Sequence, residues 1–293
     1  MNKLIVLAQV WPDQPFGGSI AMASSLRQYE LGFDSVVYVG LTEKAVSQKT
    51  SQLYIKTNFV HIETDRGSLA TRFLKSLLFS SPAITVGVGE DRIYERVKKV
   101  ILSEQEYSGT LFGVCDDNVP AVHLPRLKAD FPKILWAYRS HDVLHEAFSS
   151  FAFEGNWWMK LAWRYEIKRI KQFERNSVSS ADYSWAISSE DKALLETKFG
   201  KSIQGVFDCD IDLEKYDSVD RGDTKSILYL GSADYRKKHG LTSFVENVWK
   251  EIASQERFSK CSLILGGKGT QNFKNSELSI DGLGFVDSDE DFL

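Results

Sequence analysis

Residues 226–267 read SILYLGSADYRKKHGLTSFVENVWKEIASQERFSKCSLILGG. The runs Ser226–Leu230 and Cys261–Leu265 are short and apolar, and each is followed by glycine, which is typical of buried parallel strands. Between them, apolar residues recur at helical spacing from Leu241 to Ile252. The stretch therefore predicts a strand–helix–strand unit of a parallel sheet.

The loop between the first of these strands and the helix is strongly basic. It contains Arg236, Lys237 and Lys238. In an α/β fold such a loop opens at the carboxyl edge of the sheet, where backbone N–H groups and the helix dipole favour a phosphate. The three cations therefore predict a phosphate-binding loop, although a charge run of this kind is also common on a solvated surface.

Size and composition indicate a globular protein with more than one domain. The 293 residues are 43% hydrophobic and 26% charged, which is enough for two domains of ordinary size. The net charge of −4 gives no overall attraction to nucleic acid, so we expect no nucleic-acid partner. The cysteines Cys115, Cys209 and Cys261 lie far apart in the sequence, and we therefore expect neither a disulfide framework nor a cysteine-based metal site.

We expect no signal peptide, because polar residues and prolines soon interrupt the apolar run Leu4–Ala8. No apolar run approaches the roughly 18 residues that a membrane span requires. We therefore expect a cytoplasmic protein.

The first half of the chain repeats the strand–helix–strand pattern. We expect a strand over Leu4–Val10, a helix over residues 19–31 and a second strand over Asp34–Gly40. Gly17 and Gly18 stand at the helix start, where bare backbone can approach a ligand closely; a plain tight turn is the alternative. Further strands are expected at Leu53–Ile62, Ala83–Val88, Thr110–Cys115, Ile134–Arg139 and Ala181–Ser188.

Two of these strands end in polar clusters. Asp116 follows one of them, and His141 and Asp142 follow another. Because ligand groups in open α/β sheets come from strand ends, we expect these side chains at one ligand-binding edge. Each cluster taken alone could also form a turn or a helix cap.

Residues Trp157–Arg175 predict a long amphipathic helix that begins with Trp157 and Trp158. Its apolar stripe is Met159, Trp163, Ile167, Ile170 and Phe173, and its basic stripe is Lys160, Arg164, Lys168, Lys171 and Arg175. A basic amphipathic helix with tryptophans can lie on an anionic bilayer, which would place the protein peripherally on the inner face of a membrane. A core-packed helix with a solvated basic face is the alternative.

Taken in order, these pieces resemble the glycosyltransferases of the GT-B fold, specifically the large retaining group called family 4. The matching residues are Gly17 and Gly18 after the first strand, His141, Glu174, Ala181-Asp182, Ile187-Ser188 with Asp191, the stretch from Leu228 to Lys238, Leu263–Gly266 and Gly284–Asp287. Ser232 stands where the family often has arginine. The resemblance therefore leaves Arg236, Lys237 or Lys238 as the cation that contacts the phosphate.

The resemblance implies an α/β chain of two Rossmann-like domains with parallel sheets and a cleft between them. An acceptor-binding domain would span residues 1–205 and a nucleotide-sugar-binding domain residues 206–293, with Glu214–Lys225 as the linker. Family members continue with further strand–helix units that include a glutamate pair. We therefore expect the second domain to be incomplete, the chain to be a fragment or a shortened protein, and its transfer activity to be small.

The implied reaction moves a sugar from a nucleotide-diphosphate sugar to a hydroxyl of a carbohydrate or lipid-linked acceptor, with retention, in the synthesis of bacterial surface polysaccharide or glycoconjugates. His141 would be the catalytic-site residue that orients sugar or acceptor. Arg236 and Lys238 would stabilise the departing diphosphate while Gly17 and Gly18 close over it. The resemblance implies no metal and no cofactor. The alternatives are a non-catalytic sugar-nucleotide-binding or assembly partner and a GT-B-like sugar-nucleotide epimerase.

Overall fold

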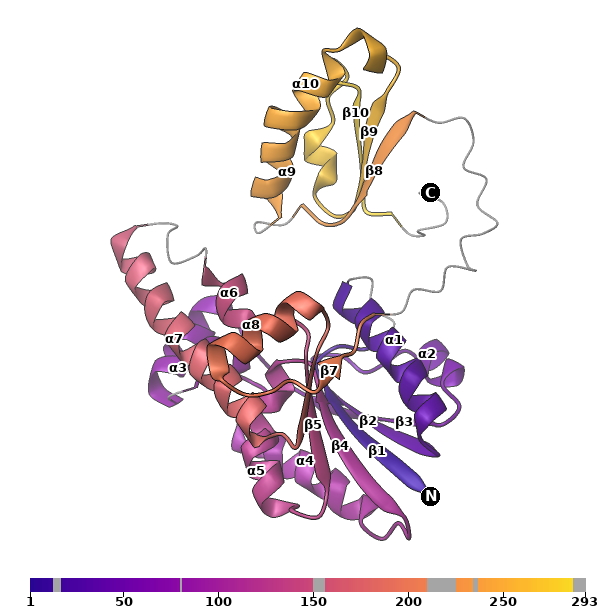
Figure 1. Ribbon diagram of the computed structural model, residues 1–293, viewed down its shortest axis with the longest axis vertical. Coiled ribbons are helices and arrows are strands. Elements are labelled where there is room, and N and C mark those ends of the chain that lie inside the picture. Colours follow the sequence, from indigo (N-terminus) through magenta and orange to yellow (C-terminus); the bar gives the residue numbers. More distant parts are fainter. Residues whose placement is uncertain (13–16, 80, 150–155, 210–224, 234–236, 287–293) are drawn as a thin grey trace. The chain divides into compact units, whose positions relative to one another are not determined.

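The computed structural model describes residues 1–12, 17–79, 81–149, 156–209, 225–233 and 237–286. The chain divides into two compact units, Met1–Ile211 and Asp212–Leu293, each built around its own parallel sheet (Figure 1). The division falls shortly after the boundary at residues 205/206 that the sequence suggests. Apart from Lys225, the expected linker Glu214–Lys225 lies outside the described residues.

Within the described residues, the first unit holds a seven-stranded parallel sheet in the order β3-β2-β1-β4-β5-β6-β7. The strands are β1 (Asn2–Ala8), β2 (Ser35–Thr42), β3 (Thr57–Glu63), β4 (Thr110–Asp116), β5 (Leu135–Ser140), β6 (Tyr183–Ala186) and β7 (Gly205–Val206). The strand order reverses direction between β1 and β4. In doubly wound sheets, ligands bind beyond the carboxyl ends of the strands at such a switch point.

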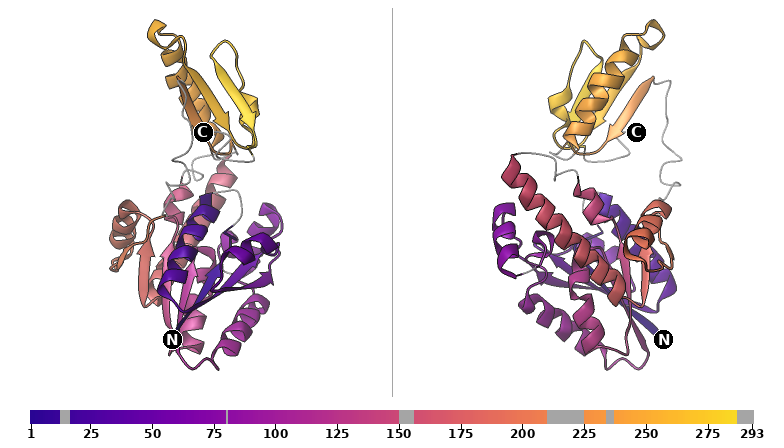
Figure 2. Two further views of the ribbon diagram at one scale, coloured as in Figure 1. Left: turned by 90° about the vertical axis from the view of Figure 1, so that its right-hand side faces the viewer. Right: turned by 60° about the vertical axis from the view of Figure 1, so that its left-hand side comes forward.

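Helices cover both faces of this sheet. One face carries α1 (Gly17–Gly32) and α2 (Gln48–Leu53), and the other carries α4 (Asp91–Glu104), α5 (Leu124–Asp130), α7 (Trp157–Ser180) and α8 (Ser189–Phe199). The two views of Figure 2 show α1 and α7 on opposite sides. The alternation of β1 explains the two cores, because Leu4 and Val6 pack toward α1 whereas Ile5 and Leu7 pack toward the other helices.

The first unit also contains two further α-helices. They are α3 (Leu69–Phe79), which packs its Phe73 edge-on against Trp163 of α7 at 5.2 Å, and α6 (Leu144–Ala147). The expected helix ends are also present: the Ser188 side chain caps α8 by accepting the N–H of Asp191, and Gly200 ends it with a φ of 65°.

Two expectations for the first unit are corrected. Ala83–Val88 is not a strand: Ala83–Thr85 forms a 3₁₀ turn, η1, and the buried Glu166 carboxylate accepts the N–H of Ala83. A short apolar run has no periodicity that separates a strand from a buried loop. The strand expected from Leu53 begins only at Thr57, because Ser47 caps a helix that continues through Leu53.

The second unit holds a three-stranded parallel sheet of described residues in the order β10-β9-β8. Its strands are β8 (Ser226–Leu230), β9 (Ser262–Gly266) and β10 (Ile280–Gly284), and its helical segment runs through α9 (Lys238–Phe244), a π-helical turn (Val245–Trp249) and α10 (Lys250–Ala253). The core is Leu241, Trp249, Leu263, Leu265 and Ile280. The Trp249 indole is fully buried, and its Nε1 donates to the Leu278 carbonyl at 2.7 Å.

The burial expected for β8 is wrong, although its parallel pairing is as expected. Ile227, Leu228 and Leu230 are 45%, 38% and 49% exposed. The reason is position: in the described sheet β8 is an edge strand that pairs with β9 alone. The third strand, β10, begins at Ile280, where it starts to pair in parallel with Leu263 of β9.

Candidate functional site

A buried ion pair lies at the carboxyl ends of β4 and β5. These strands pair in parallel with Asp116 opposite Arg139, and neither side chain is exposed. Arg139 Nη1 donates to Asp116 Oδ1 at 3.1 Å. Because a buried carboxylate is costly unless charge and hydrogen bonds compensate it, the register of the two strands is directly coupled to this contact.

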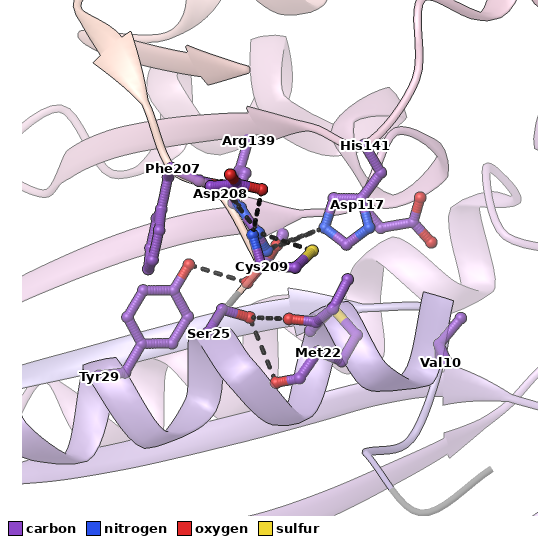
Figure 3. A network of polar contacts seen from close by, with 12 residues as sticks. Val10, Met22, Ser25, Tyr29, Asp117, Arg139, His141, Phe207, Asp208 and Cys209 are labelled. Atoms are coloured by element: carbon purple, nitrogen blue, oxygen red, sulfur yellow. Dashed lines mark hydrogen bonds and ion pairs between the residues drawn. The ribbon is translucent and has the colours of Figure 1, made fainter. Parts of the chain in front are cut away.

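Asp116 accepts two more hydrogen bonds from side chains that are distant in the sequence. The Tyr29 hydroxyl of α1 donates to Oδ2 at 2.8 Å, and His141 Nε2 lies 2.8 Å from Oδ1. Figure 3 shows Tyr29, Arg139 and His141 in this region of the first unit. Both oxygens of the carboxylate are therefore satisfied by side chains from α1 and from the end of β5.

Arg139 also holds the chain segment that follows β7. Its Nε and Nη2 donate to the Phe207 carbonyl at 3.1 and 2.9 Å, and its guanidinium carbon lies 4.6 Å from the centre of the Phe207 ring. The same ring packs edge-on against Tyr29 at 5.7 Å. We call Tyr29, Asp116, Arg139, His141 and Phe207 the Asp116 network.

In this network, neighbouring charges and hydrogen bonds oppose the effect of burial on the pKa values of Asp116 and His141. Burial alone would raise the pKa of Asp116, but the charge of Arg139 and the hydrogen bonds from His141 and Tyr29 outweigh it, and the pKa is lowered. Burial would lower the pKa of His141, yet the hydrogen bond and charge of Asp116, together with the charge of Asp117, raise it overall. His141 therefore holds a proton more readily than a free imidazole does.

The ring nitrogens of His141 have different surroundings. Nε2 lies 2.8 Å from Asp116 Oδ1 and 3.2 Å from Arg139 Nη1, and the shorter contact, to the carboxylate, favours the Nε2–H tautomer of the neutral imidazole. Nδ1 has no hydrogen-bond partner among the described residues, and the side chain is 12% exposed. Nδ1 can therefore donate to a ligand when the ring is protonated and accept from one when it is neutral.

Asn118 fixes the backbone beside this imidazole. Its Oδ1 accepts the Tyr138 hydroxyl at 3.0 Å and the His141 N–H at 3.1 Å, and its Nδ2 donates to the Asp142 carbonyl at 2.8 Å. Asn118 is 1% exposed. The ends of β4 and β5 are thus joined by a second buried polar group.

Of the residues predicted from the sequence, the structure brings Asp116 and His141 into direct contact. Asp142 has an exposed side chain, and its carbonyl accepts from Asn118 and from the Ser140 hydroxyl. Gly17 and Gly18 open α1, the helix whose Tyr29 reaches Asp116.

The basic residues predicted to bind phosphate belong to the second unit. Lys238 begins α9 and Lys237 precedes it, and both are exposed. Arg236 lies outside the described residues.

Two glycine loops meet at the carboxyl edge of the second sheet. The N–H of Gly231 donates to the Gly266 carbonyl at 2.8 Å, and Gly267 has a φ of +124°. A Cβ on Gly267 would lie 2.3 Å from the Gly231 carbonyl oxygen, so only glycine fits there. The start of the loop between β8 and α9 is therefore constrained by its contacts with Gly266 and Gly267.

Sequence reasoning missed Tyr29 and Phe207, and it placed Arg139 in the polar cluster Arg139–Asp142 at the end of its strand without giving it a role. Arg139 did carry a signal: a charged residue near the end of an otherwise apolar strand must have a buried partner or reach solvent. Tyr29 looks like an ordinary aromatic of an amphipathic helix. Phe207 contributes its carbonyl, which no residue type can indicate.

The exposed face of α3 and α7 carries large apolar side chains. These residues are 53% to 65% exposed, and we call them the α3–α7 patch: Leu74, Leu77, Trp157, Trp158, Leu161 and Tyr165. The later part of α7 differs, since Ile170 and Phe173 are buried. Among the described helices, none combines the length and apolarity needed to cross a bilayer.

The described residues contain no group of three or more His, Cys, Asp or Glu side chains arranged to hold a metal ion.

Comparison with protein-family models and with curated proteins finds no match. Solved structures, in contrast, resemble the chain over nearly its whole length, and they define its class: the fold is that of the GT-B glycosyltransferases.

One of these structures is the apo form of WaaB, a lipopolysaccharide outer core galactosyltransferase, with a TM-score of 0.52 and 14% identity over 97% of this chain and 68% of that one. A second, described as trehalose-6-phosphate from E. coli bound with UDP-2-fluoro glucose, has a TM-score of 0.56 and 9% identity over 98% and 74%. A third, Arabidopsis thaliana UGT89C1 complexed with UDP-L-rhamnose, has a TM-score of 0.50 and 10% identity over 97% and 69%. At these identities the likeness concerns the fold.

Proposed function

We propose that this chain is a glycosyltransferase that takes a sugar from a nucleotide-diphosphate sugar and attaches it to an acceptor hydroxyl. The observation that carries the proposal is the Asp116 network. Within a GT-B fold, it presents a histidine at the carboxyl ends of β4 and β5, next to the switch point of the sheet. Two of the solved structures with this fold are described with UDP-sugars bound.

In this proposal His141 orients the sugar or the acceptor through Nδ1. Asp116 holds Nε2, so the direction of Nδ1 is set before a ligand arrives and little reorganisation is required on binding. The raised pKa of His141, which results from Asp116 and Asp117 in opposition to burial, favours a donor at Nδ1.

The donor diphosphate is assigned to the second unit. Lys237 and Lys238 are exposed at the start of α9, next to the constrained loop that begins at Gly231. Cations and backbone N–H groups in this position stabilise the negative charge of a departing diphosphate without a covalent step. Arg236 is the further cation of this loop in the sequence, and Gly17 and Gly18 are the phosphate-binding candidates of the first unit.

The finer assignment is a retaining transferase of bacterial surface polysaccharide or glycoconjugate synthesis, with a carbohydrate or lipid-linked acceptor. It is supported by the sequence resemblance to family 4 and by the likeness to a lipopolysaccharide galactosyltransferase. The proposed location is the cytoplasm, with peripheral attachment to the inner face of a membrane through Trp157–Arg175. The α3–α7 patch supports this attachment because its exposed aromatic side chains lie on the same helix, α7, as the exposed Arg164 and Lys168.

The donor assignment is tested by titrating UDP, GDP and ADP, each alone and as a sugar conjugate, into the full chain. We expect one base to bind, and we expect Lys238→Ala to weaken that binding by about 1.5–3 kcal/mol, the range for a hydrogen bond to a charged group. Lys250→Ala, an exposed lysine of α10, is the matched control. Failure of every nucleotide diphosphate to bind would contradict the proposed function, and equal affinities would remove Lys238 from the site.

Transfer itself is measured with the sugar conjugate that binds and a panel of carbohydrate and lipid-linked acceptors. The anomeric configuration of the product, read by NMR, should match that of the donor. An inverted product would contradict retention, and binding with no transfer to any acceptor would favour the non-catalytic alternative.

Membrane attachment is tested by co-sedimentation with vesicles. Binding should require anionic lipid and weaken as salt is added, since each exposed Lys or Arg contributes roughly 1 kcal/mol near an anionic surface. Replacing Trp157 and Trp158 with serine should reduce binding, whereas Lys99→Ala on α4 should reduce it little. Binding that ignores lipid charge and salt would leave the face of α7 as an ordinary solvated surface.

A further inference from the structure

Two arginines meet where β3 leads into α3. Arg66 lies in the connecting loop and Arg72 in the first turn of α3, and both are half-buried. Burial and then the charge of Arg72 lower the pKa of Arg66 to about 10, against the opposing charges of Asp117 and Glu43. The two cations are therefore close enough to repel each other.

Neither arginine is neutralised by a direct ion pair among the described residues. The Nε atoms of Arg66 and Arg72 are both buried without a hydrogen-bond partner. Arg66 Nη2 donates to the Ile84 carbonyl at 2.5 Å, which is a neutral acceptor. The enclosed Nε atoms cannot themselves reach a ligand, but a buried charged group without an anionic partner is costly, so an anion at the remaining guanidinium N–H groups would offset that cost.

The backbone holds Arg66 in place. Gly87, with a φ of +87°, lies against this loop so closely that a Cβ would be 2.6 Å from the Asp65 carbonyl oxygen and 2.9 Å from Arg66 Cα. The loop therefore cannot shift toward Gly87. A fixed pair of guanidinium groups is better suited to recognition than flexible surface arginines are, because less freedom is lost on binding.

The arginine pair belongs to the same edge of the sheet as His141. Asp117, which follows β4, interacts electrostatically with both His141 and Arg66. Burial raises the pKa of Asp117, and the exposed Glu43 makes no ion pair with Arg66 among the described residues. Neither carboxylate forms an ion pair with Arg66 or Arg72 among the described residues.

We propose that Arg66 and Arg72 bind a phosphate group carried by the acceptor, so that the substrate class of this site is a phosphorylated acceptor. The inference rests on the proposed function, because it takes the edge that carries His141 as the acceptor side. Two guanidinium groups offer forked N–H donors that match phosphate oxygens, and they stay charged at any pH that the protein meets. The donor diphosphate is the other possible source of the phosphate, and the experiment separates the two.

The experiment titrates methyl phosphate and, separately, a nucleotide diphosphate into the full chain at constant ionic strength set with sodium chloride. Methyl phosphate should bind, and Arg72→Gln should weaken it at least about tenfold, the equivalent of one hydrogen bond to a charged group. Arg27→Gln, an exposed arginine of α1, should leave both affinities unchanged. The nucleotide diphosphate should bind Arg72→Gln within about twofold of the unchanged chain.

Arg66→Lys is the second variant. It removes the forked guanidinium but keeps a cation that can still donate to the Ile84 carbonyl, which should preserve the loop. It should weaken methyl phosphate binding while the thermal unfolding midpoint without ligand stays the same. The inference is overturned if methyl phosphate does not bind, if Arg72→Gln binds it unchanged, or if nucleotide diphosphate displaces it. Each of these outcomes leaves nucleotide binding measurable, so failure of this inference is distinguishable from failure of the proposed function.

Discussion

The first unit contains two carboxylate–histidine pairs whose histidines, His141 and His145, are only a few residues apart in the chain. In one, His141 Nε2 lies 2.8 Å from Asp116; in the other, His145 Nδ1 lies 2.6 Å from Glu174. Both acids are fully buried. In both pairs a buried carboxylate contacts one imidazole nitrogen. The pairs differ in the other groups that hydrogen-bond to each carboxylate.

Glu174 accepts its other hydrogen bonds from backbone N–H groups. It accepts the N–H groups of Leu144 at 2.6 Å and His145 at 3.0 Å, and so binds the start of α6 to α7. His145 Nε2 is buried without a hydrogen-bond partner, 3.6 Å from the Glu146 carboxylate. A histidine enclosed in this way has no ring nitrogen to offer a ligand, and we interpret this pair as structural.

Asp116 accepts its other hydrogen bonds from the side chains of Arg139 and Tyr29. Its histidine keeps Nδ1 without a partner among the described residues. The comparison shows that the acid's other partners, and not the carboxylate–histidine contact itself, distinguish a structural pair from one that can serve a ligand.

The largest effect in this comparison is expected from Arg139→Met. The change leaves the Asp116 carboxylate buried without its cation, and breaking such a pair costs about 3–5 kcal/mol of unfolding free energy. Urea unfolding followed by hydrogen exchange in peptides from β4 and β5 measures it. Adding Asp116→Asn to Arg139→Met should restore part of the loss, and a loss of less than about 1 kcal/mol would show that the pair is not coupled to the fold.

A smaller effect is expected from Glu174→Gln. The neutral amide keeps one acceptor oxygen but loses charge-assisted bonds to Leu144 and His145, at a cost of about 1.5–3 kcal/mol in unfolding free energy. Affinity for nucleotide diphosphate and for methyl phosphate should stay within about twofold of the unchanged chain. Loss of either ligand without loss of stability would reverse our assignment of the two pairs.

The smallest effect is a pH dependence that belongs to His141. Its folded pKa is raised, so its protonation stabilises the fold; this contribution is complete below the unfolded pKa of about 6.5 and is lost as pH rises through the folded pKa. The difference in unfolding free energy between the unchanged chain and His141→Gln should therefore be larger at about pH 5.5 than at about pH 9.

The imidazole can be followed directly in the same comparison. Asp116→Asn removes the charge that opposes burial, and NMR titration should then give a lower pKa for His141 than in the unchanged chain. A pKa that stays the same, or a stability difference that grows with pH, would contradict the assigned role of Asp116.

Much of the fold could be predicted because it depends on local pattern. Apolar runs that end in glycine or polar residues correspond to β1, β2, β4, β5, β8 and β9, and capped periodic segments correspond to α1, α7 and α8. The failures involve tertiary contacts. Ala83 leaves extended structure because Glu166, 83 residues away, accepts its N–H, and β8 is exposed because of its place in the sheet.

The candidate site divides in the same way. Strand ends indicated Asp116 and His141, because parallel strands end at one edge, and the two side chains are in contact. Their roles, and those of Gly17, Gly18 and the basic loop, stay predictions. Tyr29 and the Phe207 carbonyl could not be predicted, since they reach the network across 87 and 68 residues of chain.

These long spans have a consequence for folding kinetics. The Asp116 network joins α1, β4, β5 and the segment after β7, so it is complete only after loops of 87 and 68 residues have closed. Closing such loops costs entropy before any contact repays it, which places these contacts late in folding. Substitutions in the network should then accelerate unfolding while they change the folding rate little. The group of side chains that we expect to hold the ligand would also be the one that determines how long the native state of the first unit persists.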